Sequence, residues 1–378
     1  GASSTSPPFA PAVGANALPT LRAALLIGVF AGLGAVFQGA SISETVGKDL
    51  ILGVSITPLA AAAGLLTAAG FIVLGVQTGY PVPAAFAVTG AMVGVGISLG
   101  GDPAYDTYRR IGTFWAAVPV VSASIAYATA RLLRHRNVPE AVSIPVLGGL
   151  VGVVVANVPL SVLPSPDGQG TLAGVVSRAV GPSPTVAVGY DVAMVVASIA
   201  LGAVVLLVLR RSMWGSPESG IRGFLVGLGA LVAFSSGGSQ VGLATGPLET
   251  LFETQLSVPD FTLLLLGGAG ILIGAWMGSP RLLQAVAREY STLGVRRSIA
   301  ALVPGFLIAQ AAIALGIPIS FNKVMISSIV GSGFVARSGG GGVSLRKAGY
   351  TVGSWVGSMV GAGVISFGLY TGLHALLG

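Results

Sequence analysis

The sequence predicts an all-α polytopic membrane protein, built from two inverted-topology repeats with broken or re-entrant helices. Of its 378 residues, 53% are hydrophobic and only 8% are charged. Soluble domains carry about 25% charged residues, so this chain cannot cover a water-exposed surface. It also holds 58 glycines among long apolar runs, which is typical of closely packed membrane helices and not of the short alternating segments of a membrane barrel. We therefore expect an integral, multi-pass protein of the cell membrane.

The apolar stretches fall into two classes. A helix of about 20 apolar residues crosses the bilayer, and regular spans are predicted at 23–39, 50–75, 111–130, 141–163, 185–209, 221–234, 261–279, 298–316 and 348–377. Other stretches are apolar but interrupted by Pro, Gly and Ser, namely 1–20, 81–99, 235–252 and 318–335. Such segments predict half-helices or re-entrant hairpins, which persist at membrane depth only when buried or lining a cavity. The functional site is expected there.

Basic residues between the spans predict the orientation. Lys and Arg gather in the segments 131–140, 210–222, 281–297 and 337–347, and short basic loops usually face the cytoplasm. The Pro- and Gly-rich stretch 164–184 is expected to be a loop on the other side. The net charge of +7 is thereby explained by topology, and no nucleic-acid partner is predicted.

Several chemistries are excluded by composition. The chain has no cysteine, so disulfides, thiolate metal sites and Cys nucleophiles are absent. Its two histidines, His135 and His374, lie in a basic linker and near the C-terminus. No nucleophile and base lie near one membrane depth, so an intramembrane hydrolase is disfavoured. The sequence predicts no enzyme and no cofactor, and it assigns no metal ligand.

An internal repeat is visible when the interrupted segments are aligned. One copy begins with Gly1-Ala-Ser-Ser and the other with Gly237-Gly-Ser-Gln, and a proline follows 80 and 81 residues later, at Pro81 and Pro318. A tryptophan comes later in each copy, at Trp115 and Trp355.

The loops in equivalent positions of the two copies differ in charge, which indicates that the copies are inverted. This plan is common in secondary transporters and places the substrate near the midplane. The predicted divisions are a first repeat at 1–136, two connecting helices within 137–215, and a second repeat at 216–378. Comparison of the copies also predicts that a leading helix is missing before residue 1.

At these positions the chain resembles the inorganic phosphate transporter (PiT) family. That family's duplicated motif reads roughly Gly-Ala-Asn-Asp-x-x-Asn-Ala, followed by Gly-Pro-Leu or Val-Gly. Its place is taken here by "GASSTSPPFAPAVG" and "FSSGGSQVGLATGPL". A second repeated element, roughly Gly-x-Pro-Val-Ser-Thr-Thr-His, is matched by "GYPVPAAF" and "GIPISFNK". The resemblance implies a permease that moves inorganic phosphate across the membrane by alternating access.

The chain departs from the family motif at its acidic positions. Ser3-Ser4 and Ser239-Gln240 stand where the family has Asn-Asp. The resemblance implies coupling to sodium or protons, but hard cations prefer carboxylate and other oxygen ligands. The coupling ion therefore stays open.

An oxyanion in the membrane is expected to bind where broken helices offer backbone N–H groups and the positive end of the helix dipole. Lys323 would add a full charge, because ionisable residues within the membrane are functional by default, although a lysine can also snorkel to the interface. The predicted substrate-binding residues are Ser3, Ser4, Thr5, Ser236, Ser239, Gln240, Ser320, Asn322 and Lys323.

Three readings of the function remain open at this point. The first is a phosphate permease, and the second is a sulfate permease, because loss of both acids favours a site made of donors. The third is a non-transporting membrane sensor or partner subunit that keeps the scaffold. The expected partners are the oxyanion, the lipid bilayer and a second copy of the chain in a homodimer.

Overall fold

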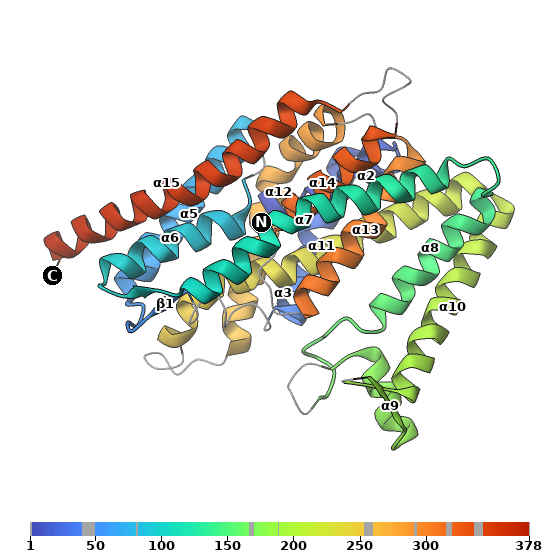
Figure 1. Cartoon of the computed structure of the whole chain (residues 1–378), viewed down its shortest axis with the longest axis horizontal. Helices are drawn as coiled ribbons and strands as arrows, with labels where there is room; N and C mark the ends of the chain where they lie inside the picture. Colours follow the sequence, from blue (N-terminus) through green and yellow to red (C-terminus); the bar gives the residue numbers. More distant parts are fainter. Residues whose placement is uncertain are drawn as a thin grey trace.

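In the computed structural model the chain is almost entirely helical (Figure 1). The structure describes residues 2–39, 50–80, 82–165, 170–187, 189–252, 260–290, 293–314, 320–335 and 343–377. Within these ranges, 8 helices are long and apolar enough to cross a membrane. They are α3 (Thr20–Gln38), α5 (Pro58–Thr78), α7 (Tyr105–Leu133), α10 (Val192–Gly215), α11 (Pro217–Leu251), α12 (Asp260–Glu289), α13 (Val295–Ala314) and α15 (Leu345–Leu377). The prediction of an all-α polytopic membrane protein is confirmed.

Shorter elements complete the chain. The helices are α1 (Ala2–Thr5), the 3-10 helix η1 (Pro7–Phe9), α2 (Ala10–Gly14), α6 (Ala84–Ser98), α8 (Glu140–Val155), α9 (Leu172–Val180) and α14 (Phe321–Phe334). Two antiparallel pairs join β1 (Ile51–Leu52) to β2 (Asp102–Pro103) and β3 (Thr185–Ala187) to β4 (Tyr190–Asp191). The N-terminal residues lie in the middle of the molecule, whereas α15 ends at its periphery (Figure 1).

The first interrupted segment is broken as predicted. The chain runs from α1 through η1 into α2, and these elements are buried. Pro7 and Pro8 open the 3-10 turn and Pro11 lies at the start of α2. Proline supplies no N–H and clashes with the preceding turn, so a straight α-helix cannot pass through this segment.

The segment 235–252 is not broken, and this prediction was wrong. Pro217–Leu251 is one continuous helix, α11. Its glycines serve packing: a Cβ on Gly237 would lie 1.9 Å from the Ala31 carbonyl oxygen of α3, and one on Gly238 would lie 2.7 Å from Gln38 Cβ. Small residues at these positions let two helix backbones touch.

The half-helices predicted in 81–99 and 318–335 are present as α6 and α14, although Pro81 and Pro318 themselves lie outside the described residues. The end of α6 leads through β2 into the start of α7. The end of α14 lies at the other end of α7, where Arg134 Nη1 donates to the Val335 carbonyl at 3.0 Å. The two half-helices therefore run from the middle of the molecule toward opposite ends.

The basic segments meet at one end of the helix bundle. Arg296 forms an ion pair with Glu140, and the Ser344 N–H donates to the Tyr290 carbonyl at 3.1 Å. Arg134 and Arg222 line a cavity together with Arg296. The basic segments lie on one side of the bundle, as they must if all of them face the cytoplasm.

The stretch 164–184 is more ordered than the predicted loop, because it contains α9, and a short hairpin of β3 and β4 follows. The Thr171 hydroxyl accepts the Gly174 N–H at 3.0 Å and caps α9. Asp191 caps α10, accepting a hydrogen bond from the Ser177 hydroxyl and, at 2.8 Å, from the Met194 N–H. These hydrogen bonds hold the pKa of Asp191 below its ordinary value. Figure 1 shows α9 at the tip of the pair formed by α8 and α10.

The half-helices are held by glycine contacts. A Cβ on Gly90 of α6 would lie 2.1 Å from the Met359 carbonyl oxygen of α15, and one on Gly331 of α14 would lie 2.2 Å from the Ala123 carbonyl oxygen of α7. Gly90 and Gly331 are therefore packing residues, as the high glycine content of the chain led us to expect of membrane helices.

Replacing Gly237 by alanine is expected to destabilise the protein by about 1–3 kcal/mol, because the new Cβ overlaps the α3 backbone. The measurement is the melting temperature of the purified protein in detergent. Gly227→Ala is the matched control on α11, since a Cβ there meets no atom within 4 Å. Equal melting temperatures for the two variants would contradict the importance of the α3–α11 contact.

Candidate functional site

The centre of the molecule is a junction of three segments that are far apart in the sequence. The Ser3 hydroxyl of α1 donates to the carbonyl of Val82, just before α6. Asn322 Nδ2, in the first turn of α14, donates to Ser3 Oγ at 3.2 Å and to the Val82 carbonyl at 3.3 Å. The starts of both half-helices are thereby tied to α1.

Both half-helices direct their N-termini at this junction. α6 begins after Pro83 and has 15 residues, and α14 begins after Ser320 and has 14 residues. The first N–H groups of a helix have no intrahelical partner and carry partial positive charge. Their convergence creates a positive potential that attracts an anion.

Ser320 contributes to the site indirectly. Its hydroxyl accepts the Lys323 N–H at 3.4 Å, so the side chain caps α14 and is 1% exposed. A serine at this position fixes where the half-helix starts. The capping bond uses the Ser320 oxygen as an acceptor, so the predicted substrate contact through the hydroxyl hydrogen stays a prediction.

One face of α11 closes the junction from another side. The Ser236 hydroxyl donates to the Ser4 carbonyl at 3.0 Å. Ser239 and Gln240 follow three and four residues later, so they share the face of Ser236. Because α11 is continuous, it contributes side chains to the site but no helix N-terminus.

Several polar atoms around the junction are buried and have no hydrogen-bond partner among the described residues. They are Ser4 Oγ, Ser239 Oγ, Gln240 Nε2, Gln240 Oε1 and Asn322 Oδ1. An unpaired buried polar group costs about 1–3 kcal/mol, so such a cluster is rare unless a guest completes it. Thr5 is buried in the same turn as Ser4.

Lys323 points away from this cluster into an aromatic box. Its Nζ donates to the Trp115 carbonyl and lies 4.7 Å from the Phe86 ring centre and 5.5 Å from the Trp355 ring centre. The Phe86 and Trp115 rings stack with their centres 3.8 Å apart. Lys323 is 6% exposed and does not snorkel to an interface. The ammonium is stabilised by cation–π contacts and stays beside the first turn of α6.

The aromatic box gives a structural role to two tryptophans that the sequence analysis had identified only as features shared by the two repeats. Trp115 lies in the first predicted repeat and Trp355 in the second, and both contact Lys323. Among the residues whose burial is described, Lys323 is the one charged side chain that is buried. Within the part of the chain whose burial is described, the interior around the junction therefore carries net positive charge.

A second polar chain was missed by sequence reasoning. Gln310 Nε2 of α13 donates to Ser235 Oγ of α11, and Gln38 Nε2 of α3 donates to Gln310 Oε1 at 3.4 Å. All three side chains are buried. The sequence feature that could have indicated this polar chain is a glutamine within a predicted apolar span, which occurs at Gln38 and again at Gln310.

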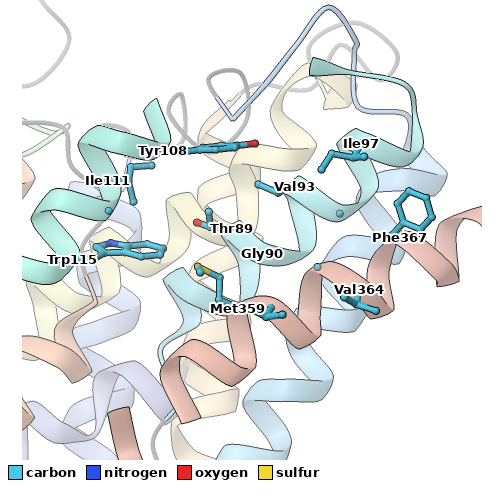
Figure 2. A pocket seen from close by; sticks show the side chains of 14 residues that line it. Thr89, Gly90, Val93, Ile97, Tyr108, Ile111, Trp115, Met359, Val364 and Phe367 are labelled. Carbon is cyan, nitrogen blue, oxygen red and sulfur yellow. The ribbon is translucent and has the colours of Figure 1, made fainter. Parts of the chain in front are cut away.

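An apolar cavity of about 570 Å³ lies between α6, α7 and α15 (Figure 2). Trp115 and Ile111 lie at one end, Thr89 lies near the middle, and Val364 and Phe367 lie at the other end. Val364 is 68% exposed, so this end faces the surrounding lipid. Apolar side chains form almost all of the walls, so this cavity cannot replace the hydration of an oxyanion.

Known proteins resemble this chain in sequence and in fold. A relative from Pyrococcus furiosus, provisionally named a phosphate permease, is 25% identical over an alignment that covers 100% of this chain and 93% of the relative. The protein named inorganic phosphate transporter 2-1, chloroplastic, of Arabidopsis thaliana is 23% identical, with 88% of this chain and 63% of that protein covered.

A solved structure entitled "The sodium-dependent phosphate transporter" has the same fold. Its TM-score is 0.82 at 23% identity, and the superposition covers 100% of this chain and 95% of that chain. The model of the phosphate transporter family matches residues 1–366. The chain therefore belongs to the phosphate transporter family.

Proposed function

We propose that this protein carries inorganic phosphate across the membrane by alternating access and binds it at the junction of α1, α6, α11 and α14. The observation that carries the proposal is the convergence of two half-helix N-termini on a group of buried, unpaired polar atoms. An anion leaving water must have its hydration replaced. Helix N-termini, hydroxyls and amides supply that replacement.

The choice of phosphate over sulfate is supported by the amides of the site. Gln240 has an unpaired donor in Nε2 and an unpaired acceptor in Oε1, and Asn322 has an unpaired acceptor in Oδ1. Phosphate at neutral pH carries a P–OH group that needs an acceptor, whereas sulfate has no proton to donate. The sequence suggested a site of donors alone, and these amide oxygens favour the protonated anion.

Lys323 is proposed to act through its charge and not by direct contact. Its ammonium lies against Phe86 in the first turn of α6, so its field adds to that of the half-helix. Charges interact strongly at low dielectric constant. A fixed cation near the junction offsets the cost of bringing an anion to membrane depth.

Alternating access is supported by the directions of the half-helices. α6 and α14 start at the same junction and run toward opposite ends of α7. Each half-helix is then placed to control access from one side, as in inverted repeats. Ser3, Ser4, Ser239 and Asn322 are at most 2% exposed, which corresponds to a closed state of such a cycle.

The proposal is tested by uptake of radiolabelled phosphate and sulfate into proteoliposomes. We expect phosphate to accumulate and an excess of unlabelled sulfate to compete weakly. Replacing sodium by choline, and collapsing the pH gradient, identifies the coupling ion. Absence of uptake of either anion, with phosphate binding retained, would favour the sensor or partner-subunit reading.

Ser239→Ala is expected to weaken phosphate binding about tenfold, because a hydrogen bond to an ion is worth roughly 1.5–3 kcal/mol. Melting temperature without phosphate should stay equal or rise, since the variant removes an unpaired buried hydroxyl. Ser358→Ala is the matched control, a buried serine on α15 whose hydroxyl bonds only its own helix at the Trp355 carbonyl. A lower melting temperature with unchanged binding would assign Ser239 a structural role.

Lys323→Met is expected to reduce phosphate uptake at least about tenfold, because it removes the buried charge and keeps most of the side-chain volume. Lys323→Arg keeps the charge and should retain more uptake than the methionine variant. The measurement is initial uptake at matched protein density, after folding has been checked by melting temperature. Equal uptake by wild type and Lys323→Met would contradict an electrostatic role.

A further inference from the structure

A second polar cavity, of about 670 Å³, lies at the basic end of the molecule, apart from the central junction. Its walls come from the end of α7, the starts of α8, α11 and α13, and the residue after α2. The lining residues are Ala15, Arg134, Glu140, Glu218, Ile221, Arg222, Leu225, Gly294, Val295, Arg296 and Arg297. We call this the arginine vestibule.

The arginine vestibule carries excess positive charge. Four arginines and two glutamates line it, which gives a formal charge of 4 − 2 = +2. One pair is neutralised internally, because Arg296 pairs with Glu140. Arg134 and Arg297 lie close enough to repel each other electrostatically. A bound anion between them would turn this repulsion into attraction.

Helix dipoles add to the arginines. α8, α11 and α13 all begin at the vestibule, and they have 16, 35 and 20 residues. Glu140 and Glu218 lie in the first turns of α8 and α11 and offset those two dipoles, whereas the first turn of α13 has no acidic residue, so α13 contributes most. The Gly294–Arg297 turn also offers the first backbone N–H groups of α13. Backbone N–H groups and guanidinium groups together are the usual ligands of phosphate.

The vestibule adjoins the chain segment that leads to the central junction. Ala15 lines the cavity directly after α2. Ser298, next to Arg297, donates to the Pro11 carbonyl of α2 at 2.8 Å and is fully buried. Phe9 of η1 is also fully buried and packs against α11 at Gly229. The α1–η1–α2 segment thus has the vestibule at one end and Ser3 and Ser4 at the other.

We propose that the arginine vestibule is a second binding site for a phosphate-type oxyanion, the point where free inorganic phosphate enters or leaves the transport route at the basic end. This assignment rests on the proposed function for its place in the route, but binding at the vestibule is measurable without transport. A phospholipid headgroup offers the same phosphate chemistry, and the experiment below separates the two sources.

The test is equilibrium binding of radiolabelled inorganic phosphate to the purified protein in nanodiscs of neutral phosphatidylcholine. The combined Arg134→Gln and Arg297→Gln variant is expected to lose one class of site, with at least about a tenfold increase in its Kd. Arg109→Gln is the matched control, an exposed arginine near the opposite end of α7, and should leave both classes intact. Ser239→Ala should weaken the other class alone.

Salt dependence gives a measurement that needs no variant. Arg134, Arg222 and Arg296 are exposed and Arg297 is partly buried. Exposed charges are screened by salt, so vestibule affinity should fall severalfold between low and physiological ionic strength, while the affinity of the buried junction changes little. A single salt-independent class of site, or unchanged binding in the double-arginine variant, would overturn the proposal.

Anionic phosphatidylglycerol nanodiscs distinguish the source. Equal phosphate binding in both lipids supports free phosphate, whereas loss of the vestibule class in phosphatidylglycerol would overturn that assignment in favour of a lipid headgroup. If binding behaves as expected but no variant or wild type transports phosphate, the proposed function fails and the vestibule site stands.

Discussion

The hydrogen bonds that join Ser3, Val82 and Asn322 are the constraint on which the rest of the centre depends. The Val82 carbonyl precedes the N-cap Pro83 of α6, and the first helical hydrogen bonds, from Phe86 and Ala87, go to the Pro83 carbonyl instead. Donors from α1 and α14 satisfy the Val82 carbonyl in place of helix bonds. Each such bond contributes only about 0.5–1.5 kcal/mol, yet together they fix the starting points of two helices. These hydrogen bonds therefore contribute more to the geometry of the junction than to the stability of the protein.

The same centre retains polar groups that a structure optimised for stability would remove. Ser4, Ser239 and Gln240 keep buried atoms without partners among the described residues, and Lys323 keeps a buried ammonium. Such features lower stability and are usually retained for function. Other buried atoms without partners among the described residues lie farther out, for example Tyr108 OH and Asn157 Oδ1. What distinguishes the centre is that such atoms occur there together with two helix N-termini and a buried ammonium.

Much of the frame was predictable because composition and proline positions are local signals. The break at Pro7 and Pro8 and the start of α6 after Pro83 follow from prolines, which disfavour helix continuation, and the start of α14 follows from Ser320, a preferred helix N-cap. The α11 error has a clear origin: glycine and serine at 235–239 fit a break and a close helix contact equally well. Only the partner helix α3 decides between the two, and its contact is not local in sequence.

The direction of the Lys323 side chain was beyond sequence reasoning for a related reason. Adjacent residues on a helix diverge by about 100°, so Asn322 and Lys323 cannot both face Ser3. Which of them does so depends on how α14 is rotated between α1 and α7. The buried Gln38 and Gln310 pair likewise joins helices 272 residues apart in sequence. The tryptophan shared by the two repeats indicated a common structural position, but it did not indicate that both tryptophans contact Lys323.

The glycine contacts of the half-helices cross between the two predicted repeats. α6, from the first, is fastened to α15 of the second, and α14, from the second, is fastened to α7 of the first. Backbones in such close contact slide apart only with difficulty, so each half-helix and its long partner behave as one rigid unit. In the proposed alternating-access cycle, the parts that shift against each other are therefore interlocked assemblies drawn from both predicted repeats, and neither repeat is expected to move as a separate body.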